Sequence, residues 1–258
     1  MAVRDDLGTR IKEFYENIPK TKLMRRCPVI IRIDGKAFHT FCRKFKKPFD
    51  DVLISAMQKT TKKLCENIQG VRLGYCQSDE ISLLVCDYDK LTSSAWFDYE
   101  VQKMCSIAAS MATLYFNQSF REEADEYLEA WNIDLSYYNA LLNAIDIGAM
   151  FDARCFNIPK EEVTNYFYWR QIDASRNSVQ MVGQSKFSHG QLQHKSCNEI
   201  QDMLFKEYNI NWNDFPTYKK RGSCCIKTDE GWKIDKDIPI WKEDGRKYID
   251  ELVMRGEM

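Results

Sequence analysis

Hydrophobic and polar positions change their period several times along the chain, and each change predicts a different element. Near the N-terminus, apolar residues recur at helical spacing and predict a short amphipathic helix; they are Leu7, Ile11, Phe14, Tyr15 and Ile18, with Pro19 next. The run 28–33 is apolar and rich in β-branched residues, as in a buried strand, and it stops at the turn signal Asp34-Gly35.

A second helix and a hairpin are predicted next. Asp50 and Asp51 can cap a helix that Gly70 ends; its apolar stripe comprises Leu53, Met57, Thr60, Leu64 and Ile68. The segments 71–76 and 81–86 are strand candidates joined by a short link at 77–80, which predicts a hairpin. An apolar helical face over 101–116 then predicts a long buried helix. This part of the chain therefore reads β-α-β-β-α.

The second half is mainly helical in its pattern. A strand is predicted within 149–158, and helices within 121–147 and 161–210. The tail from residue 211 is weakly patterned, with a possible strand at 222–227. Short strands around a helix pair favour an α+β fold. No repeat or Pro/Gly/Ser-rich linker interrupts the chain, so we expect one compact domain.

Composition adds bounds on the class of protein. The 258 residues include 37 basic and 38 acidic side chains, and 44% are hydrophobic, which is typical of a globular protein. A net charge of −1 excludes nucleic-acid binding through bulk charge but allows a local basic patch. No apolar run approaches the ~20 residues of a membrane helix, and the N-terminus has no signal sequence. Ten cysteines without C-x-x-C spacing then indicate free thiols in a reducing cytoplasm.

Three carboxylates stand where predicted strands end. Asp34 follows the first strand, whereas Asp79 and Glu80 lie in the hairpin link. If these strands are neighbours, the carboxylates converge at one end of a sheet, where carboxylate oxygens with phosphates and water suit Mg²⁺. Gly35 would let a ligand approach the backbone closely. The alternative is that all of them are ordinary turn residues, because acidic side chains are common in turns.

Basic side chains near these turns could meet a triphosphate, or could simply be solvated surface charge. They are Arg43, Lys44, Lys46, Lys47, Lys103, Lys195, Lys219, Lys220 and Arg221. The chain contains no G-x-x-x-x-G-K-[ST] loop, so a Walker-type phosphate site is excluded. It also has neither a G-x-S-x-G elbow nor a G-x-G-x-x-G fingerprint.

Several ordered blocks resemble the tRNA-histidine guanylyltransferases and their relatives, the template-dependent 3′–5′ polymerases. The blocks are R-I-D-G-K-A-F-H from Arg32, K-P-F-D from Lys47, G-Y-C-Q-S-D-E-I-S from Gly74, F-D-A-R from Phe151, Y-W-R-Q from Tyr168 and K-S-C-N-E from Lys195. The resemblance covers roughly residues 5–225. Because the blocks occur in the family's order, they are far more specific than any one of them alone.

The resemblance implies a palm-like antiparallel sheet with helices packed on it, similar to polymerase palm and nucleotide cyclase cores. It implies a single catalytic domain, with the core over about 5–160 and a helical and C-terminal extension over about 161–258. It makes Asp34 and Asp79 the ligands of two Mg²⁺ ions, assisted by the Gly35 carbonyl, and Glu80 a third catalytic acid. The implied nucleotide-binding residues are Lys36, Ala37, Phe38, His39, Lys44, Ser78 and Lys103. Glu100 departs from the arginine that some relatives carry three residues before this last lysine.

The implied reaction adds nucleotides to the 5′ end of tRNA. A nucleoside triphosphate, commonly ATP, activates the 5′-monophosphate, and the 3′-hydroxyl of an incoming GTP or other triphosphate attacks it. After W-R-Q-x-D, eukaryotic guanylyltransferases have C-H-I-N-N-L-Y-N, where this chain has Ser175 for His and a single matching amide, Asn177. This departure favours the branch that repairs tRNA 5′ ends. The candidate RNA-binding residues are Arg176, Asn177, Lys195, Lys219, Lys220 and Arg221.

Alternative functions remain open at this point. They are a guanylyltransferase that adds one G to tRNA-histidine, a palm-fold cyclase or metal-dependent nuclease, and a silent tRNA-binding module. The resemblance also implies a homo-oligomer, commonly a tetramer. Trp131, Tyr137 and Tyr138 could pack on a neighbouring subunit, or could belong to the core of one chain.

Overall fold

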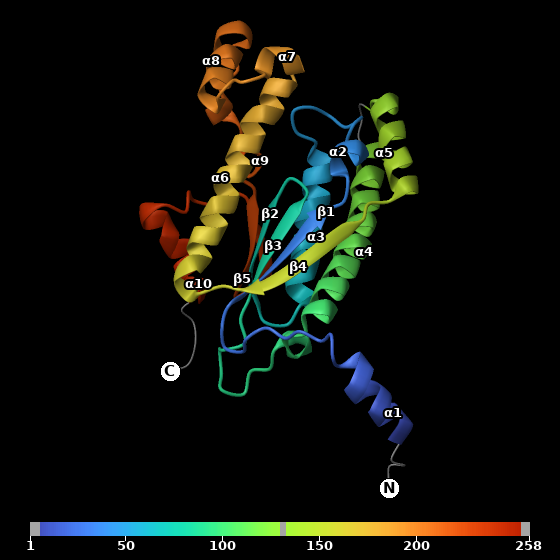
Figure 1. Cartoon of the computed structure of the whole chain (residues 1–258). Coiled ribbons are helices and arrows are strands. Elements are labelled where there is room, and N and C mark those ends of the chain that lie inside the picture. Colours follow the sequence, from blue (N-terminus) through green and yellow to red (C-terminus); the bar gives the residue numbers. More distant parts are fainter. Residues whose placement is uncertain (1–5, 130–132, 254–258) are drawn as a thin grey trace.

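The computed structural model describes residues 6–129 and 133–253. Within these residues, six strands form one antiparallel sheet in the order β4-β1-β3-β2-β5-β6 (Figure 1). The strands are β1 (Val29–Gly35), β2 (Val71–Gln77), β3 (Glu80–Val85), β4 (Phe151–Asn157), β5 (Ser223–Thr228) and β6 (Gly231–Asp235). Together with the helices, this sheet confirms the predicted α+β, palm-like fold.

The helices vary widely in length. The α-helices are α1 (Asp6–Ile11), α2 (Phe38–Phe41), α3 (Asp51–Asn67), α4 (Val101–Leu128), α5 (Leu135–Ile147), α6 (Lys160–Gln184), α7 (His189–Leu192), α8 (Cys197–Tyr208), α9 (Thr217–Arg221) and α10 (Lys247–Val253). A π-helical turn (Lys12–Glu16) extends α1, and short 3₁₀ turns lie at Trp96–Tyr99, Trp212–Asp214 and Glu243–Arg246. Among the described residues, no helix is long and apolar enough to span a bilayer.

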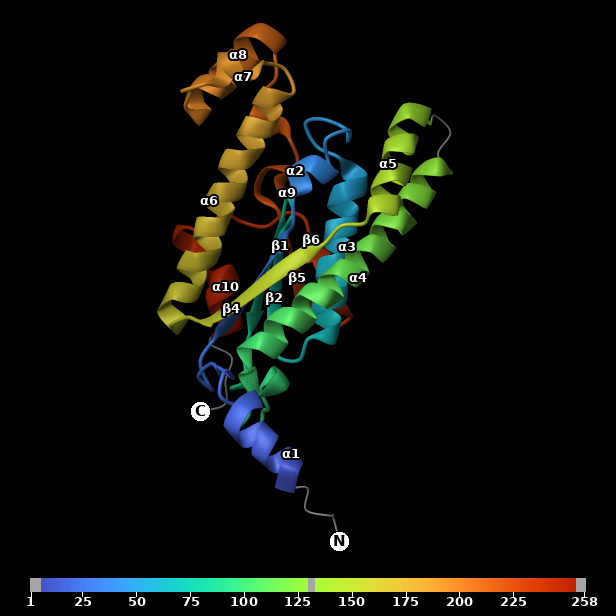
Figure 2. The ribbon, with the colours of Figure 1, turned by 45° about the vertical axis from the view of Figure 1, so that its right-hand side comes forward.

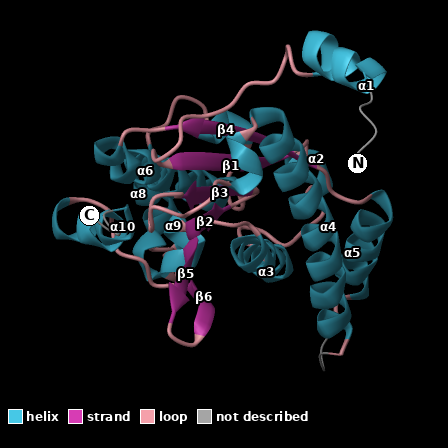
Figure 3. Ribbon diagram, turned by 90° about the horizontal axis from the view of Figure 1, so that it is seen from below, coloured by secondary structure: helices cyan, strands magenta, loops and turns pink. Residues whose placement is uncertain are grey.

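Helices cover both faces of the sheet (Figure 3). On one face, Ile31 and Ile33 of β1 pack with α3 and α4 in a single apolar cluster. On the other face, Ile30 belongs to a second cluster with Val163 and Phe167 of α6. Since successive strand residues point to opposite faces, Arg32 and Asp34 continue the α6 face of β1. The end of the sheet beside α6 is therefore charged rather than apolar.

A third apolar cluster lies beyond the sheet. The last turns of α6 pack there with α8 through Val179, Val182, Ile200 and Leu204, together with Trp212. Figures 1 and 2 show α7 and α8 at the far end of α6, away from the strands. The long helix α6 thus connects the sheet face to a separate small helical cluster.

Most predicted elements are confirmed, with differences at particular places. The region 121–147 contains the end of α4 and all of α5, and the region 161–210 is divided among α6, α7 and α8. Strand β6 was not predicted. The N-terminal helix forms, but its apolar residues Phe14 and Tyr15 are exposed instead of packed.

Of the aromatic residues considered for subunit contacts, Tyr137 is part of this chain's own core. Its hydroxyl donates a hydrogen bond of 2.7 Å to Asp50, and its ring packs against Tyr127. Of the two alternatives left open for Tyr137, the structure therefore favours the core of one chain. Trp131 lies outside the described residues. All ten cysteines are free, as predicted.

Candidate active site

Polar side chains form a row across the end of the sheet that faces α6. Asp152 of β4 lies opposite Asp34 of β1, Asp34 lies opposite Glu80 of β3, and Glu80 lies opposite Gln77 of β2. Directly opposed residues of antiparallel strands share one face. The pairing register thus brings together carboxylates that are far apart in the sequence, as the strand ends predicted.

Asp79 joins this row from the turn between β2 and β3. The backbone amide of Gly35 donates a hydrogen bond of 3.1 Å to the Asp79 carbonyl, so the two turns are fastened together. The Ser78 hydroxyl donates to the Asp79 carboxylate at 3.1 Å. Burial raises the pKa of Asp79, and the nearby Asp34 carboxylate adds to this effect, while hydrogen bonds from its own amide and Ser78 oppose it.

Packing requires glycine at position 35. A Cβ atom at this position would lie 2.2 Å from the Phe38 ring. That ring is buried among Phe41, Phe116 and Phe151, so it has little freedom to move aside. A side chain at residue 35 would therefore push the Asp34 turn away from the Asp79 turn.

Glu80 is engaged by an arginine from α6. Arg170 donates two hydrogen bonds of 2.7 Å to the two Glu80 oxygens, and it also reaches Asp173 at 2.9 Å. Burial raises the pKa of Glu80, and the charges of Arg170 and Arg32 oppose that shift. Because both of its oxygens are already bound, Glu80 orients the α6 side of the site in this structure. Its predicted part as a third catalytic acid stays a prediction.

Two further arginines lie beside Asp34. Arg32 approaches Asp34 at 3.6 Å and Glu80 at 3.8 Å, and its buried Nε has no hydrogen-bond partner among the described residues. Arg154 lies opposite Arg32 in the sheet and approaches Asp34 at 4.0 Å. These cations give the site groups that can pair with phosphate oxygens.

The donor set fits magnesium. Asp34 and Asp79 offer carboxylate oxygens, and Gly35 offers a carbonyl in the same turn region. Protein sites for Mg²⁺ commonly supply one or two carboxylates and leave the other positions to water and substrate phosphates. Among the described residues, no group of three or more His, Cys, Asp or Glu side chains that could hold a metal ion is found. A cavity of about 440 Å³ lies over these residues and also includes Trp169, Arg170, Asp173 and Asn177.

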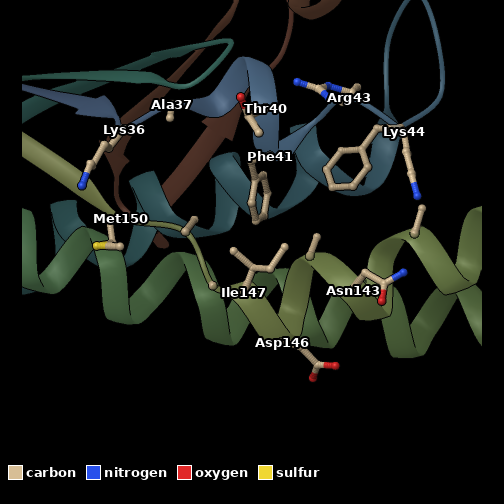
Figure 4. A pocket seen from close by; sticks show the side chains of 15 residues that line it. Lys36, Ala37, Thr40, Phe41, Arg43, Lys44, Asn143, Asp146, Ile147 and Met150 are labelled. Atoms are coloured by element: carbon tan, nitrogen blue, oxygen red, sulfur yellow. The ribbon is translucent and has the colours of Figure 1, made fainter.

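The predicted nucleotide-binding residues fall into separate places. Ser78 lines the carboxylate cavity. Lys36, Ala37 and Lys44 instead line a larger cavity of about 680 Å³ between α2 and α5 (Figure 4). Although larger, this cavity is lined by neither Asp34 nor Asp79. Phe38 has a buried side chain, which leaves only its backbone available to a ligand.

Lys103 is remote from the carboxylates within one chain. It lies in the first turn of α4, whereas the Thr113 hydroxyl of the same helix accepts a hydrogen bond from the Phe151 amide, and Phe151 is paired with Gly35. Ten residues of α-helix span about 15 Å. The structure therefore does not bring Lys103 to Asp34. His39 is an exposed residue of α2.

The candidate RNA-binding residues also differ in their settings. Lys220 is 8% exposed and its ammonium donates to the Asn213 carbonyl at 2.6 Å, so it does not face RNA as expected. Lys219 pairs with Asp51 at 2.6 Å, and Arg221 lies over the Trp212 ring. The remaining candidates are Arg176 and Asn177, both beside Asp173 on α6, and Lys195, which pairs with Glu199.

Sequence reasoning missed cations that the fold delivers to the site. Arg32, Arg154 and Arg170 lie within the blocks that carry the family resemblance, but their pattern alone gave them no role. Only the tertiary structure shows that Arg32 and Arg154 approach Asp34 and that Arg170 binds Glu80.

Fold and site together define a palm-like α+β protein in which carboxylates and arginines meet at one end of the sheet. The sequence matches the tRNAHis guanylyltransferase family over residues 8–159 and the Thg1 C terminal domain over residues 161–250. The chain therefore belongs to the tRNAHis guanylyltransferase family, and it is a nucleotidyltransferase.

Individual relatives agree with this placement. A bacterial tRNA(His) guanylyltransferase (Thg1)-like protein in complex with ATP is 43% identical, with a TM-score of 0.84 over 97% of this chain and 100% of that one. A second such structure, in complex with GTP, is 40% identical, with a TM-score of 0.75 over 96% of this chain and 99% of that one. A probable tRNA(His) guanylyltransferase of Homo sapiens is 28% identical and spans 87% of this chain and 73% of that protein.

Proposed function

We propose that this protein adds nucleotides to the 5′ end of tRNA in the 3′–5′ direction, copies the opposite strand, and so repairs incomplete 5′ ends. The observation that carries the proposal is the meeting of Asp34 and Asp79 at one end of the sheet, with arginines beside them. ATP, GTP and other nucleoside triphosphates are the proposed co-substrates, supported by the ATP and GTP complexes of the bacterial Thg1-like proteins.

The proposed chemistry has two phosphoryl transfers. First, the tRNA 5′-monophosphate attacks the α-phosphorus of a nucleoside triphosphate and releases pyrophosphate. Next, the 3′-hydroxyl of the incoming nucleotide attacks the activated 5′-phosphate and releases the nucleoside monophosphate. Positioning and electrostatic stabilisation provide most of the catalysis in such reactions.

Asp34, Asp79 and the Gly35 carbonyl would hold two Mg²⁺ ions, which supply charge stabilisation for the attacking and leaving oxygens. The protein's own contribution is orientation. The Gly35–Asp79 hydrogen bond fixes the two turns relative to each other, and Arg32 and Arg154 are placed to bind phosphate oxygens. Ser78 and the segment 36–39 stay proposed contacts for the triphosphate, while Lys44 and Lys103 would need a second nucleotide or another subunit.

The repair branch is supported by the segment after Asp173. The Ser175 hydroxyl donates to the Gln171 carbonyl of its own helix, so it offers no equivalent of an imidazole. Arg176 is 64% exposed and paired with Asp173, a setting suited to a phosphate. Such a site would read base-pair geometry with the opposite strand instead of one fixed base. The alternative, addition of a single G to tRNA-histidine, is the second candidate.

The decisive experiment compares two tRNAs in Mg²⁺ with all four triphosphates. One lacks its first 5′ nucleotide, the other is full-length tRNA-histidine, and the 5′ ends are mapped after reaction. We expect the truncated tRNA to gain the Watson–Crick complement, with the higher kcat/KM, because that ratio measures differential transition-state binding. More efficient G addition opposite A on full-length tRNA-histidine would assign the protein to the guanylyltransferase branch. A cyclic nucleotide or shortened RNA would refute both branches.

A homo-oligomer, specifically a tetramer, belongs to the same proposal. It is supported by exposed apolar side chains, among them Leu7, Phe14 and Tyr15 near the N-terminus and Ile147 at the end of α5. Light scattering at micromolar concentration tests it, and a clean monomer would contradict it.

A further inference from the structure

In the Y-W-R-Q block of α6, Arg170 and Gln171 make hydrogen bonds that hold the structure together. Arg170 binds Glu80, as described above. The Gln171 side chain donates to the Pro239 carbonyl at 2.8 Å and accepts from the Trp241 amide at 3.1 Å, which ties the C-terminal segment to α6. Both residues are buried. Trp169, between Tyr168 and Arg170, is 53% exposed and lines the cavity that holds Asp34 and Asp79.

Exposure alone would mean little, because single exposed apolar residues are common. The orientation of this indole, however, is fixed by its neighbours. The guanidinium carbon of Arg170 lies 4.5 Å from the ring centroid, and Arg170 is itself held by Glu80 and Asp173. The Tyr166 ring meets the indole at 6.0 Å and 65°. An aromatic surface that is already ordered loses little entropy when a flat ligand stacks on it.

The rest of the cavity wall determines which flat ligand fits. Arg32 lines the cavity beside Asp34 and can pair with a phosphate, and the carboxylates of Asp34 and Asp79 suit a metal-bound phosphate. A planar group joined to a phosphate is a nucleotide. Base stacking on aromatic side chains is also tolerant of sequence, because every base has a π-face. That tolerance suits a site that must accept any base.

We propose that Trp169 is the stacking platform for the nucleobase of the nucleotide whose phosphate lies at Asp34 and Asp79. The proposal rests on the proposed function. The base comes either from the 5′-terminal nucleotide of the RNA or from a free nucleoside triphosphate, and both sources present the same chemistry. Arg170 acts here as a positioning residue, since it holds the indole and does not itself meet the base.

Equilibrium binding tests the proposal without relying on turnover. The variants are Trp169→Ala, Trp169→Phe and the matched control Ile172→Ala, which removes a side chain that is 50% exposed on the same helix. The RNA probes are a tRNA transcript and the same transcript with an abasic 5′-terminal nucleotide. The free-ligand probes are ATP, GTP and ribose 5-triphosphate, which lacks a base.

Trp169→Ala should weaken binding of the base-containing probe by roughly 5- to 150-fold, and should leave binding of its base-free counterpart unchanged. Trp169→Phe should keep most of the affinity, and Ile172→Ala should match the wild type. A loss confined to the RNA probes assigns the base to the RNA, and a loss confined to the triphosphates assigns it to the free nucleotide; either result supports the proposal.

Two results would overturn the proposal. One is unchanged affinity of Trp169→Ala for every base-containing probe. The other is an equal loss on base-containing and base-free probes, which would mean a general disturbance of the fold. Failure of the proposed function has a different signature: the wild type would bind with the Trp169 dependence and yet leave the tRNA 5′ end unextended.

Discussion

Replacing Arg170 by alanine should strongly destabilise the protein, because it leaves the buried Glu80 carboxylate without its charge partner. Glu80 is 5% exposed, and its cation at hydrogen-bond distance is Arg170, with Arg32 no closer than 3.8 Å. Removing one partner of a buried ion pair costs about 3–5 kcal/mol. For a chain of this size that corresponds to a fall in Tm of roughly 6–20 °C. Urea denaturation should show the same loss as a lower midpoint with an unchanged slope.

The same helix offers a matched control. Arg176 also pairs with Asp173, but it is exposed to solvent, and exposed pairs contribute about 0–1 kcal/mol. Arg176→Ala should therefore change the free energy of unfolding little. The double variant Arg170→Met with Glu80→Gln should recover part of the stability that Arg170→Ala loses, because no unpaired charge then remains buried.

The pH dependence gives an independent check. In Arg170→Ala, burial still raises the pKa of Glu80 while the main opposing cation is gone, so the pKa moves further above its unfolded value of about 4.3. A raised folded-state pKa contributes stability that is present below the unfolded pKa and lost as pH rises through the folded one. The loss in the free energy of unfolding of Arg170→Ala, relative to the wild type, should thus be largest near pH 7 and decrease toward pH 4. If Arg170→Ala lost no more free energy of unfolding than Arg176→Ala at every pH, the reasoning would be refuted.

Three other outcomes are expected. Asp34→Asn or Asp79→Asn should leave the circular dichroism spectrum unchanged. Each should lower the rate of single-turnover nucleotide addition at least ~10²–10³-fold, by analogy with removal of one oxyanion donor. Rates near the wild-type value would contradict the proposal that these carboxylates hold metal ions. Lys220→Ala should cost about 1.5–3 kcal/mol of stability, since it removes the charged hydrogen bond that the buried Lys220 side chain donates to the Asn213 carbonyl. Lys219→Ala should affect urea denaturation little. Cys76, whose pKa burial raises to about 12, should resist iodoacetamide at pH 7 in peptide mass spectrometry, and rapid labelling would contradict its burial.

Sequence periodicity predicted the elements that carry strong patterns. The β1 run and the hairpin at 71–85 have buried residues at nearly every position, so they stand out as apolar segments with turn signals. For the same reason the carboxylates at the strand ends could be expected to meet. Strand β6 carries no such signal: it is a short edge strand with only partly buried residues, and its pairing with β5 depends on tertiary context.

Charged residues were the least predictable part of the site. A lysine in a basic run is usually solvated, yet Lys220 points inward because the Asn213 carbonyl accepts from it. Arg170 lies 90 residues from Glu80 in the sequence, and nothing local in α6 indicates that they pair. Such contacts depend on where a whole helix lies on the sheet, which a pattern along one element does not encode.

The pairing of Glu80 with Arg170 has a consequence for how the two halves of the chain act together. Asp34, Asp79 and Glu80 lie in the region 8–159, whereas Trp169, Arg170 and Asn177 come from the region 161–250. The hydrogen bond of 2.8 Å between Ser82 and Tyr166 joins the same two regions one register step deeper in the sheet. Since Glu80 directly follows Asp79, any shift of α6 that moves Arg170 also pulls on the turn that carries a proposed metal ligand. The carboxylates and the side of α6 that carries Trp169 and Arg170 are therefore coupled through these contacts. We expect that substitutions on α6 can change the chemical step without altering the proposed metal ligands.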